Sequence, residues 1–492
     1  MAYAQADYTV WTADGMTKVY RASPPPKALP RAVRICAARN EYESAQVVIR
    51  TGSRPLENVS IACSDLLGPS SRKVSARNIG LYRVAYVPVP VNAADTPDPL
   101  PPLTPLHIAP NTNQPVWVTV YVPKGTPAGE YRGTLTVSAA GAPERRVAVV
   151  LTVWDFALPD TPTSRTAFGI WGSCIAYAHQ VKPDTRQYRE LMARYYVAQL
   201  EHRISAIEPP LPLNSPEVGR YLNDPRVTAF MIPYSDDTWQ MRANVDRCRK
   251  NGWLQKAYFY PVDEPSSAES YALLKERADR IHAIDRSLKV TSPFYRGPEF
   301  PTDKTVYELL DGYVNLWCPN IQYLDLQAMQ AKRAKGEEVW WYPTGQIPPY
   351  PTFTLNHADG VDHRILMWMQ KLYDVQGLLY WASTWWAPAV IKDVWENLAT
   401  VPEIDPNIYG VGSLFYPGSK VGLAGPVGSI RLECIRDGLE DFDYLTLLER
   451  KIGAENTKAM VRRLVRGMTD YEHSPRRLQM MRRQIARLLQ QA

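Results

Sequence analysis

The stretch from Ala257 to Pro265 constrains the fold of this chain more than any other. It begins with an apolar, aromatic run of strand length and ends with two adjacent carboxylates, Asp263 and Glu264. Proline disfavours helical geometry in the residue before it, so Glu264 is predicted to be extended. The next residues, Ser266–Ser267–Ala268–Glu269, have the spacing of a capping box that begins a helix. Strand, acid pair and helix form a β/α unit, in which the connecting loop lies on the catalytic side.

The same alternation of strands and helices runs through residues 165–450. Helical patterns such as Arg186–Gln199 and Asp362–Tyr373 separate most of the strand candidates. Eight β/α units predict an α/β TIM (β/α)8 barrel rather than a doubly wound sheet, with the acid pair at the end of strand 4. The eight candidates are Ala167–Cys174, Arg203–Ile207, Thr228–Tyr234, Ala257–Val262, Lys289–Tyr295, Tyr313–Pro319, Glu338–Thr344 and Gly377–Ser383.

Residues 1–160 are predicted to form a separate all-β sandwich, which makes the protein multidomain. Short apolar runs such as Val47–Ile49, Val116–Val122 and Val147–Trp154 alternate with clusters of Pro, Gly, Asn and Asp. The segment Leu158–Pro159–Asp160–Thr161–Pro162–Thr163 predicts a stiff linker between the sandwich and the barrel.

Residues 451–492 are predicted to be a basic helical extension packed on the barrel. Leu478, Met481, Ile485 and Leu488 recur at helical spacing, which indicates that one face of the last helix is buried. The arginines of this region are interpreted as a solvated outer face. A nucleic-acid site is not predicted, because no aromatic residues lie among them after Tyr471.

The cysteines and the hydropathy pattern bound the function further. The six cysteines form no CxxC pair and have no nearby Cys or His at metal-ligand spacing, so neither a metal nor a cofactor is expected. No apolar run is long enough to span a membrane. Ala4–Gln5–Ala6 resembles the end of a signal peptide, which predicts an exported protein. Cysteine pairing and oligomeric state stay open.

Aromatic residues gather at the predicted strand ends. The chain has 14 Trp and 29 Tyr against 9 Phe, and core packing is the alternative explanation for this excess. Because sugar rings pack on aromatic faces, we expect a carbohydrate pocket at the barrel mouth, with Arg296 and Asn320 binding hydroxyl groups. The aromatic residues assigned to this pocket are Trp171, Tyr234, Tyr295, Trp317, Tyr342, Trp381 and Trp385.

Two neighbouring acids do not suit the usual arrangement in which two carboxylates flank a glycosidic bond from different strands. They suit a substrate-assisted reaction, in which the 2-acetamido group of the sugar attacks C1. Glu264 would then be the general acid/base, and Asp263 would hold the acetamido group. The alternative is structural, since helix dipoles favour acids in front of a helix without any catalytic role.

The chain resembles glycoside hydrolase family 123, which includes bacterial β-N-acetylgalactosaminidases. The resemblance covers nearly the whole chain, and its motifs are Ala38–Ser44, Pro115–Pro123, Ala128–Gly133, Asp263–Pro265 and Arg436–Leu445. It implies a β-sandwich before a (β/α)8 barrel, and an Asp–Glu pair that acts with the acetamido group of the substrate. Asp263 and Glu264 match that pair. The run Glu440–Asp443 is interpreted as structural.

The prediction is therefore a retaining exo-hydrolase that acts on a glycan and releases terminal β-linked N-acetylgalactosamine. One alternative is a glycosidase for sugars without the acetamido group, with Asp236, Asp237 or Glu396 as the nucleophile. Another is a non-catalytic carbohydrate-binding protein on a hydrolase scaffold. The sugar epimer, the aglycone and the aromatic residues that touch substrate stay open.

Overall fold

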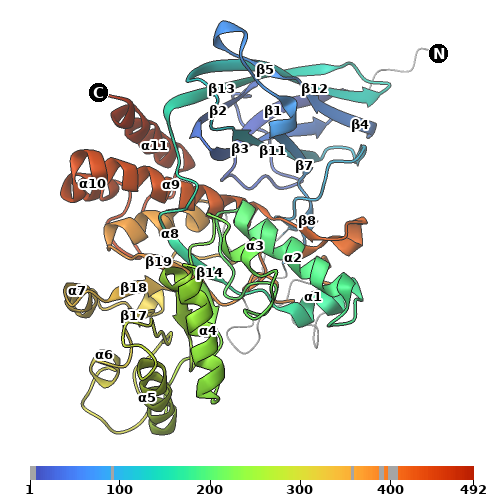
Figure 1. The fold of residues 1–492 in the computed structure, drawn as a ribbon. Helices are drawn as coiled ribbons and strands as arrows, with labels where there is room; N and C mark the ends of the chain where they lie inside the picture. The colour runs from blue at the N-terminus through green and yellow to red at the C-terminus, as the bar shows by residue number, and fades with distance from the viewer. Residues whose placement is uncertain (1–6, 90–93, 356–359, 387–392, 397–407, 492) are drawn as a thin grey trace.

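The structure is a computed structural model that describes residues 7–89, 94–355, 360–386, 393–396 and 408–491. A β domain lies above an α/β domain, and helices from the C-terminal part of the chain lie between and beside them (Figure 1). Ala4–Gln5–Ala6 lies outside the described residues, and the export that it suggests stays a prediction. All six cysteines are free. Among the described residues, no helix is both long and apolar enough to cross a membrane.

Two large sheets enclose the hydrophobic core of the β domain, and β8 and β9 form a separate two-stranded pair. The first sheet has the strand order β1-β3-β11-β7, and the second has a main path of β10-β4-β12-β13-β2. Val116, Val118 and Val120 of β11 alternate into the core, where they meet Val149 and Leu151 of β13. The strands are β1 (Tyr8–Asp14), β2 (Ala32–Arg39), β3 (Glu41–Thr51), β4 (Leu56–Cys63), β5 (Leu66–Leu67), β6 (Lys73–Val74), β7 (Ile79–Arg83), β8 (Tyr86–Val87), β9 (Thr96–Pro97), β10 (Leu106–Ile108), β11 (Asn113–Val122), β12 (Gly129–Ala140) and β13 (Arg145–Ala157).

The α/β domain is built on parallel strands. A curled half-barrel sheet has the order β14-β19-β18-β17, and a separate parallel pair joins β15 to β16. Single parallel bridges join Phe168 to Ala206, Phe259 to Val290, and Thr291 to Leu316. The strands of this domain are β14 (Arg165–Phe168), β15 (Phe230–Ile232), β16 (Ala257–Phe259), β17 (Leu316–Trp317), β18 (Glu338–Trp341) and β19 (Gly377–Tyr380), followed by a small pair, β20 (Tyr416–Pro417) and β21 (Pro426–Val427).

Each of the eight predicted strand ranges contains residues in a parallel pairing, but the paired stretches are shorter than predicted. For example, β14 ends at Phe168, and the residues from Gly172 onward belong to α1 because Trp171 is already the N-cap of that helix. The helices of the domain are α1 (Gly172–His179), α2 (Arg186–Glu201), α3 (Gly219–Leu222), α4 (Thr238–Lys250), α5 (Ala268–His282), α6 (Val306–Leu309), α7 (Leu326–Ala334) and α8 (Val361–Leu372).

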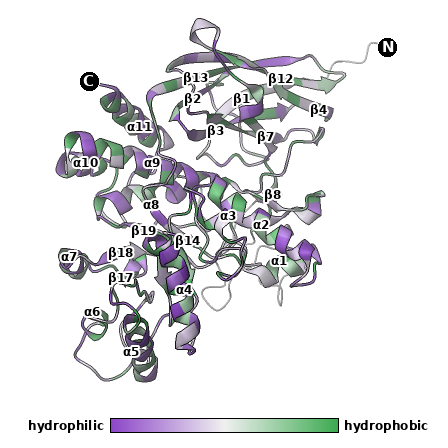
Figure 2. Cartoon of the chain, viewed as in Figure 1, coloured by the Kyte–Doolittle hydropathy of each residue, from purple (hydrophilic) through white to green (hydrophobic). Residues whose placement is uncertain are grey.

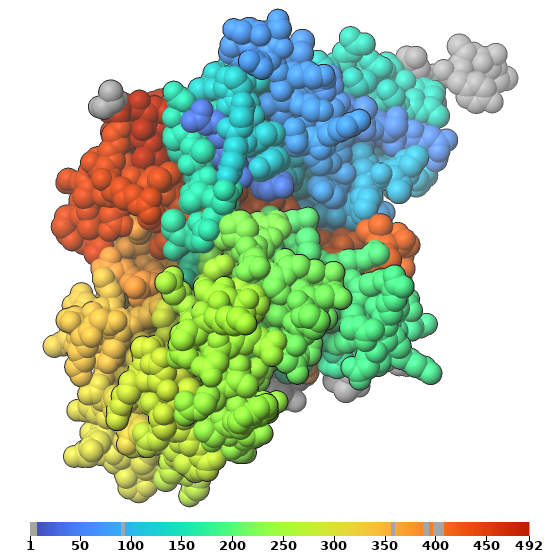
Figure 3. Space-filling view, in the orientation of Figure 1, coloured from blue at the N-terminus to red at the C-terminus, as the bar shows by residue number. Residues whose placement is uncertain are grey.

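Three C-terminal helices lie beside the two domains: α9 (Ile430–Ile452), α10 (Ala454–Val461) and α11 (Pro475–Gln490). α9 connects the domains, because it packs on both α8 and β3. α11 packs on α9 and β13, and Figure 3 shows these helices against the side of the β domain. Hydrophilic and hydrophobic residues are interleaved along α10 and α11 (Figure 2). Leu478, Met481 and Ile485 are buried as expected. The prediction that the arginines form a solvated face is only partly correct, because Arg482 is buried.

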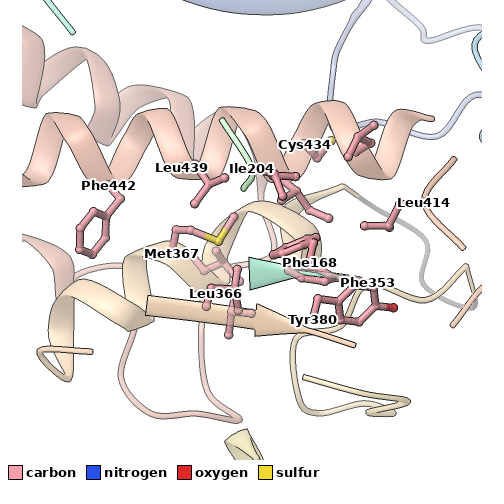
Figure 4. Close-up of a cluster of buried hydrophobic side chains, with 14 of the residues drawn as sticks. Phe168, Ile204, Phe353, Leu366, Met367, Tyr380, Leu414, Cys434, Leu439 and Phe442 are labelled. Atoms are coloured by element: carbon pink, nitrogen blue, oxygen red, sulfur yellow. The ribbon is translucent and has the colours of Figure 1, made fainter. Parts of the chain in front are cut away.

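α9 crosses α8 closely through apolar side chains. Leu439 projects from α9 toward Met367 of α8 (Figure 4). A Cβ atom at Gly438 would lie 2.3 Å from Met367 Cε and 2.8 Å from the carbonyl oxygen of Arg364. The absence of a side chain at Gly438 therefore permits this helix crossing.

The other faces of α8 and α9 carry a buried ion network, which we define as Glu41, Glu43, Arg203, Arg364, Glu440, Asp441, Asp443 and Arg482. Arg364 Nε and Nη2 donate to the two oxygens of Asp441 at 2.7 and 2.9 Å, and Arg364 also pairs with Glu43 of β3. Arg482 of α11 bonds Asp441 and Glu41. The network thus joins the β domain to α8, α9 and α11.

Arg203 extends this network to the second parallel segment, by which we mean Arg203–Ile207 with its bridge from Ala206 to Phe168. Its guanidinium group donates to Glu440 at 3.1 Å and to Asp443 at 3.0 Å. The linker is fixed beside it, because Asn40 Nδ2 donates to the carbonyl oxygen of Leu158 and Thr163 donates to Asp443. The acidic run on α9 is therefore structural, as interpreted from the sequence.

We expect Arg364→Met to destabilise the protein by about 3–5 kcal/mol, because it leaves Glu43 and Asp441 buried with fewer counter-charges. Urea unfolding followed by tryptophan fluorescence measures this change. The control is Arg186→Met, which removes an exposed ion pair with Glu190 and should leave the midpoint unchanged. Equal midpoints for the two variants would contradict a stabilising role for the network.

Candidate active site

The predicted acid pair lies on the loop between β16 and α5. The helix begins after Ser267, whose side chain accepts a hydrogen bond from the backbone N–H of Ser270. Ser270 completes the capping box, so the cap lies one residue later than the pattern from Ser266 to Glu269 predicted. The acids therefore precede the first turn of α5 by only a few residues.

The following proline had suggested that Glu264 is extended. This prediction is wrong, because Glu264 has a positive φ of 40°. This left-handed conformation is unfavourable for a residue with a side chain, and it persists only where the surroundings impose it. Hydrogen bonds fix the loop on both sides of the acids. Arg277 donates to the carbonyl oxygen of Pro261 at 2.6 Å, Ser292 Oγ donates to that of Val262 at 2.8 Å, and the N–H of Glu299 donates to that of Ser266 at 2.8 Å.

Each carboxylate is oriented by its own tyrosine. The hydroxyl of Tyr260 donates to Asp263 Oδ1, and the hydroxyl of Tyr342 donates to Glu264 Oε1. Tyr342 follows β18 and is only 2% exposed, packed beside Cys318 in the interior of the α/β domain. Within the described part of the chain, the second oxygen of each acid has no hydrogen bond, so both oxygens can meet a substrate.

The pKa of Glu264 is raised above its usual value, mainly because burial disfavours the charged carboxylate. The hydrogen bond from Tyr342 opposes this shift, the negative charge of Asp263 adds to it, and the positive charge of Arg296 opposes it. A raised pKa keeps a proton on Glu264 at higher pH, as a general acid requires.

Three of the predicted pocket residues form one tryptophan cluster. The ring centroid of Trp171 lies 6.2 Å from that of Trp381 and 4.8 Å from that of Trp385. Trp171 and Trp381 also line a cavity of about 330 Å³ at the ends of β14 and β19. The cluster therefore borders a space large enough for a small ligand.

Arginine side chains link three further pocket residues to the acid loop. These residues are Tyr234, Tyr295 and Arg296. The guanidinium group of Arg277, which holds Pro261, stacks over the ring of Tyr234 at 4.7 Å. Arg296 stacks over Tyr295 at 4.7 Å and pairs with Glu299. Its charge acts on Glu264, so it affects the acid directly.

Two predicted pocket residues have other roles. Trp317 is fully buried on the helix-facing side of β17, where Lys332 stacks on its ring and Tyr307 packs against it. The neighbours of Trp317 in the strand, Leu316 and Cys318, face the interior instead, so its assignment to the pocket is wrong. Asn320 is 2% exposed, and its side chain bonds Thr344, Gln346 and the backbone of Gln322.

The alternative nucleophiles each have a partner within the protein. Asp237 caps α4 by accepting from two backbone N–H groups, and Asp236 accepts from the hydroxyl of Tyr234. Glu396 pairs with Lys420 at 3.2 Å. Two other residues near the site, Tyr260 and Glu208, had not been predicted. Tyr260 lies two residues after the inward-facing Tyr258, so the period-two pattern of the strand contained the signal for it.

Family models match both parts of the chain. The model of the glycoside hydrolase 123 N-terminal domain matches residues 16–139, and that of the glycoside hydrolase 123 catalytic domain matches residues 235–448. The chain belongs to glycoside hydrolase family 123. The catalytic match includes Asp263, Glu264 and the acidic run of α9. Membership in family 123 supports glycosidase activity on a glycan.

A family 123 glycoside hydrolase from Clostridium perfringens has a similar solved structure. It matches over 98% of this chain and 97% of its own, with a TM-score of 0.73 and 13% sequence identity, which shows a shared fold. A GH2 β-galacturonidase from Eisenbergiella tayi matches over 89% of this chain and 73% of its own, with 10% identity. Its TM-score of 0.32 does not establish a common fold. No curated protein sequence matches this family 123 member.

We expect Tyr342→Phe to move the alkaline limb of glycoside hydrolysis to higher pH. The lost hydroxyl stabilises the ionised carboxylate, so its removal raises the pKa of Glu264 further and keeps the acid protonated at higher pH. The measurement is kcat/KM against pH for a natural glycoside, because its leaving group needs a proton and the rate therefore follows the protonation of the acid. Tyr323→Phe, which removes an exposed hydroxyl, is the control. A shift to lower pH would exclude this role of Tyr342.

Proposed function

We propose that the protein is a retaining exo-glycoside hydrolase that releases terminal β-linked N-acetylgalactosamine by substrate-assisted catalysis. The observation that carries the proposal is the placement of Asp263 and Glu264 side by side on one loop, each bonded to a different tyrosine. Two acids held in this way act on neighbouring atoms of one sugar. They do not lie on opposite sides of a ring, as a nucleophile and an acid would.

In the first step, Glu264 donates its proton to the glycosidic oxygen while the acetamido carbonyl oxygen of the sugar attacks C1. The bond from C1 to the leaving oxygen breaks, and an oxazolinium intermediate forms. Asp263 accepts a hydrogen bond from the acetamido N–H and offsets the developing positive charge. Glu264, now a carboxylate, then removes a proton from water as the water attacks C1. The bond from C1 to the acetamido oxygen breaks in this step, which restores the acetamido group. Two inversions at C1 give net retention.

The proposal includes a complete (β/α)8 barrel formed by the eight parallel segments. The half-barrel sheet, the pair of β15 with β16 and the single bridges between them all support this arrangement. It would put the acids after the fourth strand, at the face where barrel enzymes have their active sites. The substrate would contact residues around this mouth, which we assign as Trp171, Tyr234, Tyr295, Arg296, Tyr342, Trp381 and Trp385.

Two further observations favour this reaction over the alternatives. The structure of the C. perfringens enzyme concerns glycolipid glycan hydrolysis, which supports a glycan substrate. Asp237 caps α4 and Glu396 pairs with Lys420, so these two carboxylates are less available as a nucleophile than the acetamido group. The raised pKa of Glu264 favours an active enzyme over a binding protein.

For Glu264→Gln we expect kcat to fall roughly 10³-fold on a natural glycoside, whose leaving group needs a proton. On 4-nitrophenyl β-N-acetylgalactosaminide the loss should be much smaller, because nitrophenolate leaves without protonation. Steady-state kinetics with both substrates measure the difference. Equal losses would remove Glu264 from the role of general acid.

For Asp263→Asn we expect a large fall in kcat and a smaller change in KM, because an amide can hold the acetamido group without offsetting its charge. A thiazoline analogue of N-acetylgalactosamine should inhibit the wild type strongly and the variant distinctly less.

The same mechanism excludes an ester between sugar and protein. Mass spectrometry after incubation with a 2-fluoro sugar should therefore show no adduct. An adduct on any carboxylate would instead support a glycosidase that uses a protein nucleophile.

A further inference from the structure

A cavity of about 330 Å³ lies at the ends of β14, β19 and the second parallel segment, beside α2. Two of its lining residues, Trp171 and Trp381, are among those assigned above to the substrate, but the steps of the proposed mechanism leave open which part of the substrate they contact. Its lining combines aromatic rings, prolines and one carboxylate, and comprises Gly169, Ile170, Trp171, Met192, Tyr196, Ile207, Glu208, Pro209, Pro210 and Trp381.

Trp171 gives this cavity a rigid apolar wall. Its side chain is 40% exposed, although its position is fixed on several sides. The indole N–H donates to the carbonyl oxygen of Trp381 at 3.3 Å, and the backbone N–H donates to Thr384 Oγ1 at 2.8 Å. Trp385 packs against the ring at 4.8 Å between centroids. An exposed aromatic face that is already ordered can bind the C–H face of a sugar at little entropic cost.

Glu208 supplies the cavity with a hydrogen-bond acceptor. It follows the second parallel segment, and in the described ranges no hydrogen bond or ion pair engages its carboxylate. Surrounding protein atoms raise the pKa of Glu208, but its side chain stays accessible to solvent. Its charge also acts on Tyr258, whose buried hydroxyl has no partner in the described structure. A carboxylate in this setting gains from a ligand that donates hydroxyl groups.

The distance between Glu208 and the acid loop indicates which ring of the substrate the cavity binds. Met231 of β15 donates its backbone N–H to the carbonyl oxygen of Ile207 at 2.7 Å, and β15 pairs with β16. Glu208 therefore lies two strand spacings of ~4.8 Å from the strand that precedes the acids, about 10 Å in total. A sugar with its C1 at Glu264 and its acetamido group at Asp263 occupies the space beside the acid loop. The cavity is then left for the ring on the other side of the scissile bond.

We propose that Trp171 and Glu208 form a subsite for the leaving-group sugar, in which a hexose ring stacks on Trp171 and donates hydroxyl hydrogen bonds to Glu208. The inference rests on the proposed function of Asp263 and Glu264. It predicts a preference for substrates in which the released sugar is linked to a second hexose.

Two substrates with the same terminal sugar separate this role from catalysis. One is a disaccharide of N-acetylgalactosamine β-linked to galactose, and the other is 4-nitrophenyl β-N-acetylgalactosaminide. Glu208→Gln should lower kcat/KM for the disaccharide roughly 10- to 100-fold, the value of a charge-assisted hydrogen bond. It should change kcat/KM for the aryl glycoside less than about twofold, because a nitrophenyl ring has no hydroxyl to donate. Trp171→Ala should lower kcat/KM for both, since either ring can stack on the indole.

Glu217→Gln is the matched control. Glu217 lies in the same long loop, its side chain is 66% exposed and paired with Arg220, and it does not line the cavity. It should leave both kcat/KM values unchanged, and thermal unfolding checks that each variant is folded.

Equal losses on both substrates for Glu208→Gln would put the carboxylate on the cleaved sugar, and no loss on either would remove it from substrate binding. Both results overturn the proposal. If the wild type cleaves neither substrate, the proposed function fails separately. Calorimetric titration with the disaccharide then tests the subsite, and equal affinities of the wild type and Glu208→Gln would overturn it.

Discussion

The buried ion network around α9 is the interaction on which the rest of the molecule depends. Burying a charge costs several kcal/mol in lost hydration, and neighbouring opposite charges recover that cost only when all of them are in place. Arg364, Arg482 and Arg203 come from three distant parts of the chain and meet carboxylates of β3 and α9. The network therefore specifies one relative placement of the β domain and the α/β domain. It also explains why two motifs far apart in sequence, Ala38–Ser44 and Arg436–Leu445, contain so many charged residues.

The acid loop is likewise fixed by contacts with other parts of the chain. Its position is fixed by groups outside the loop. These are Arg277 of α5, Ser292 directly after the bridged residues Val290 and Thr291, and the backbone at Glu299. These bonds hold Glu264 in a backbone conformation that it would avoid in a free peptide. The Glu264 carboxyl group is thus pre-positioned by the residues around it, and in the proposed role of general acid it would need little reorganisation when a substrate binds.

Local patterns in the sequence predicted the elements well and the orientation of side chains less well. Strands occur in six of the eight predicted ranges, single parallel bridges occur in the other two, and helices such as α2 and α8 lie close to their predicted bounds. These elements follow from hydrophobic periodicity, which is a local property. Trp317 was misplaced because periodicity shows which residues share a face but not which face is inside. Its helix-facing position depends on the phase of β17 against its neighbours.

The remaining differences come from tertiary contacts. The conformation of Glu264 depends on bonds to residues up to 35 positions away, and Pro265 alone gave the opposite expectation. Arg482 resembles the other arginines of a basic helix, and only its contact with Asp441 and Glu41 shows that it is buried. Glu208 had no distinguishing signal, because an acid in a proline-rich loop is ordinary until its neighbours are known.

The bond between Tyr342 and Glu264 has one more consequence. It joins the loop after β16 to the end of β18, two strands that are not neighbours in either sheet. The proton affinity of the acid is therefore tuned by the spacing between separate parts of the scaffold. A small separation of the two strands would break this hydrogen bond and raise the pKa of Glu264 before any secondary structure is lost. The pKa of Glu264 therefore depends on the distance between the loop after β16 and the end of β18.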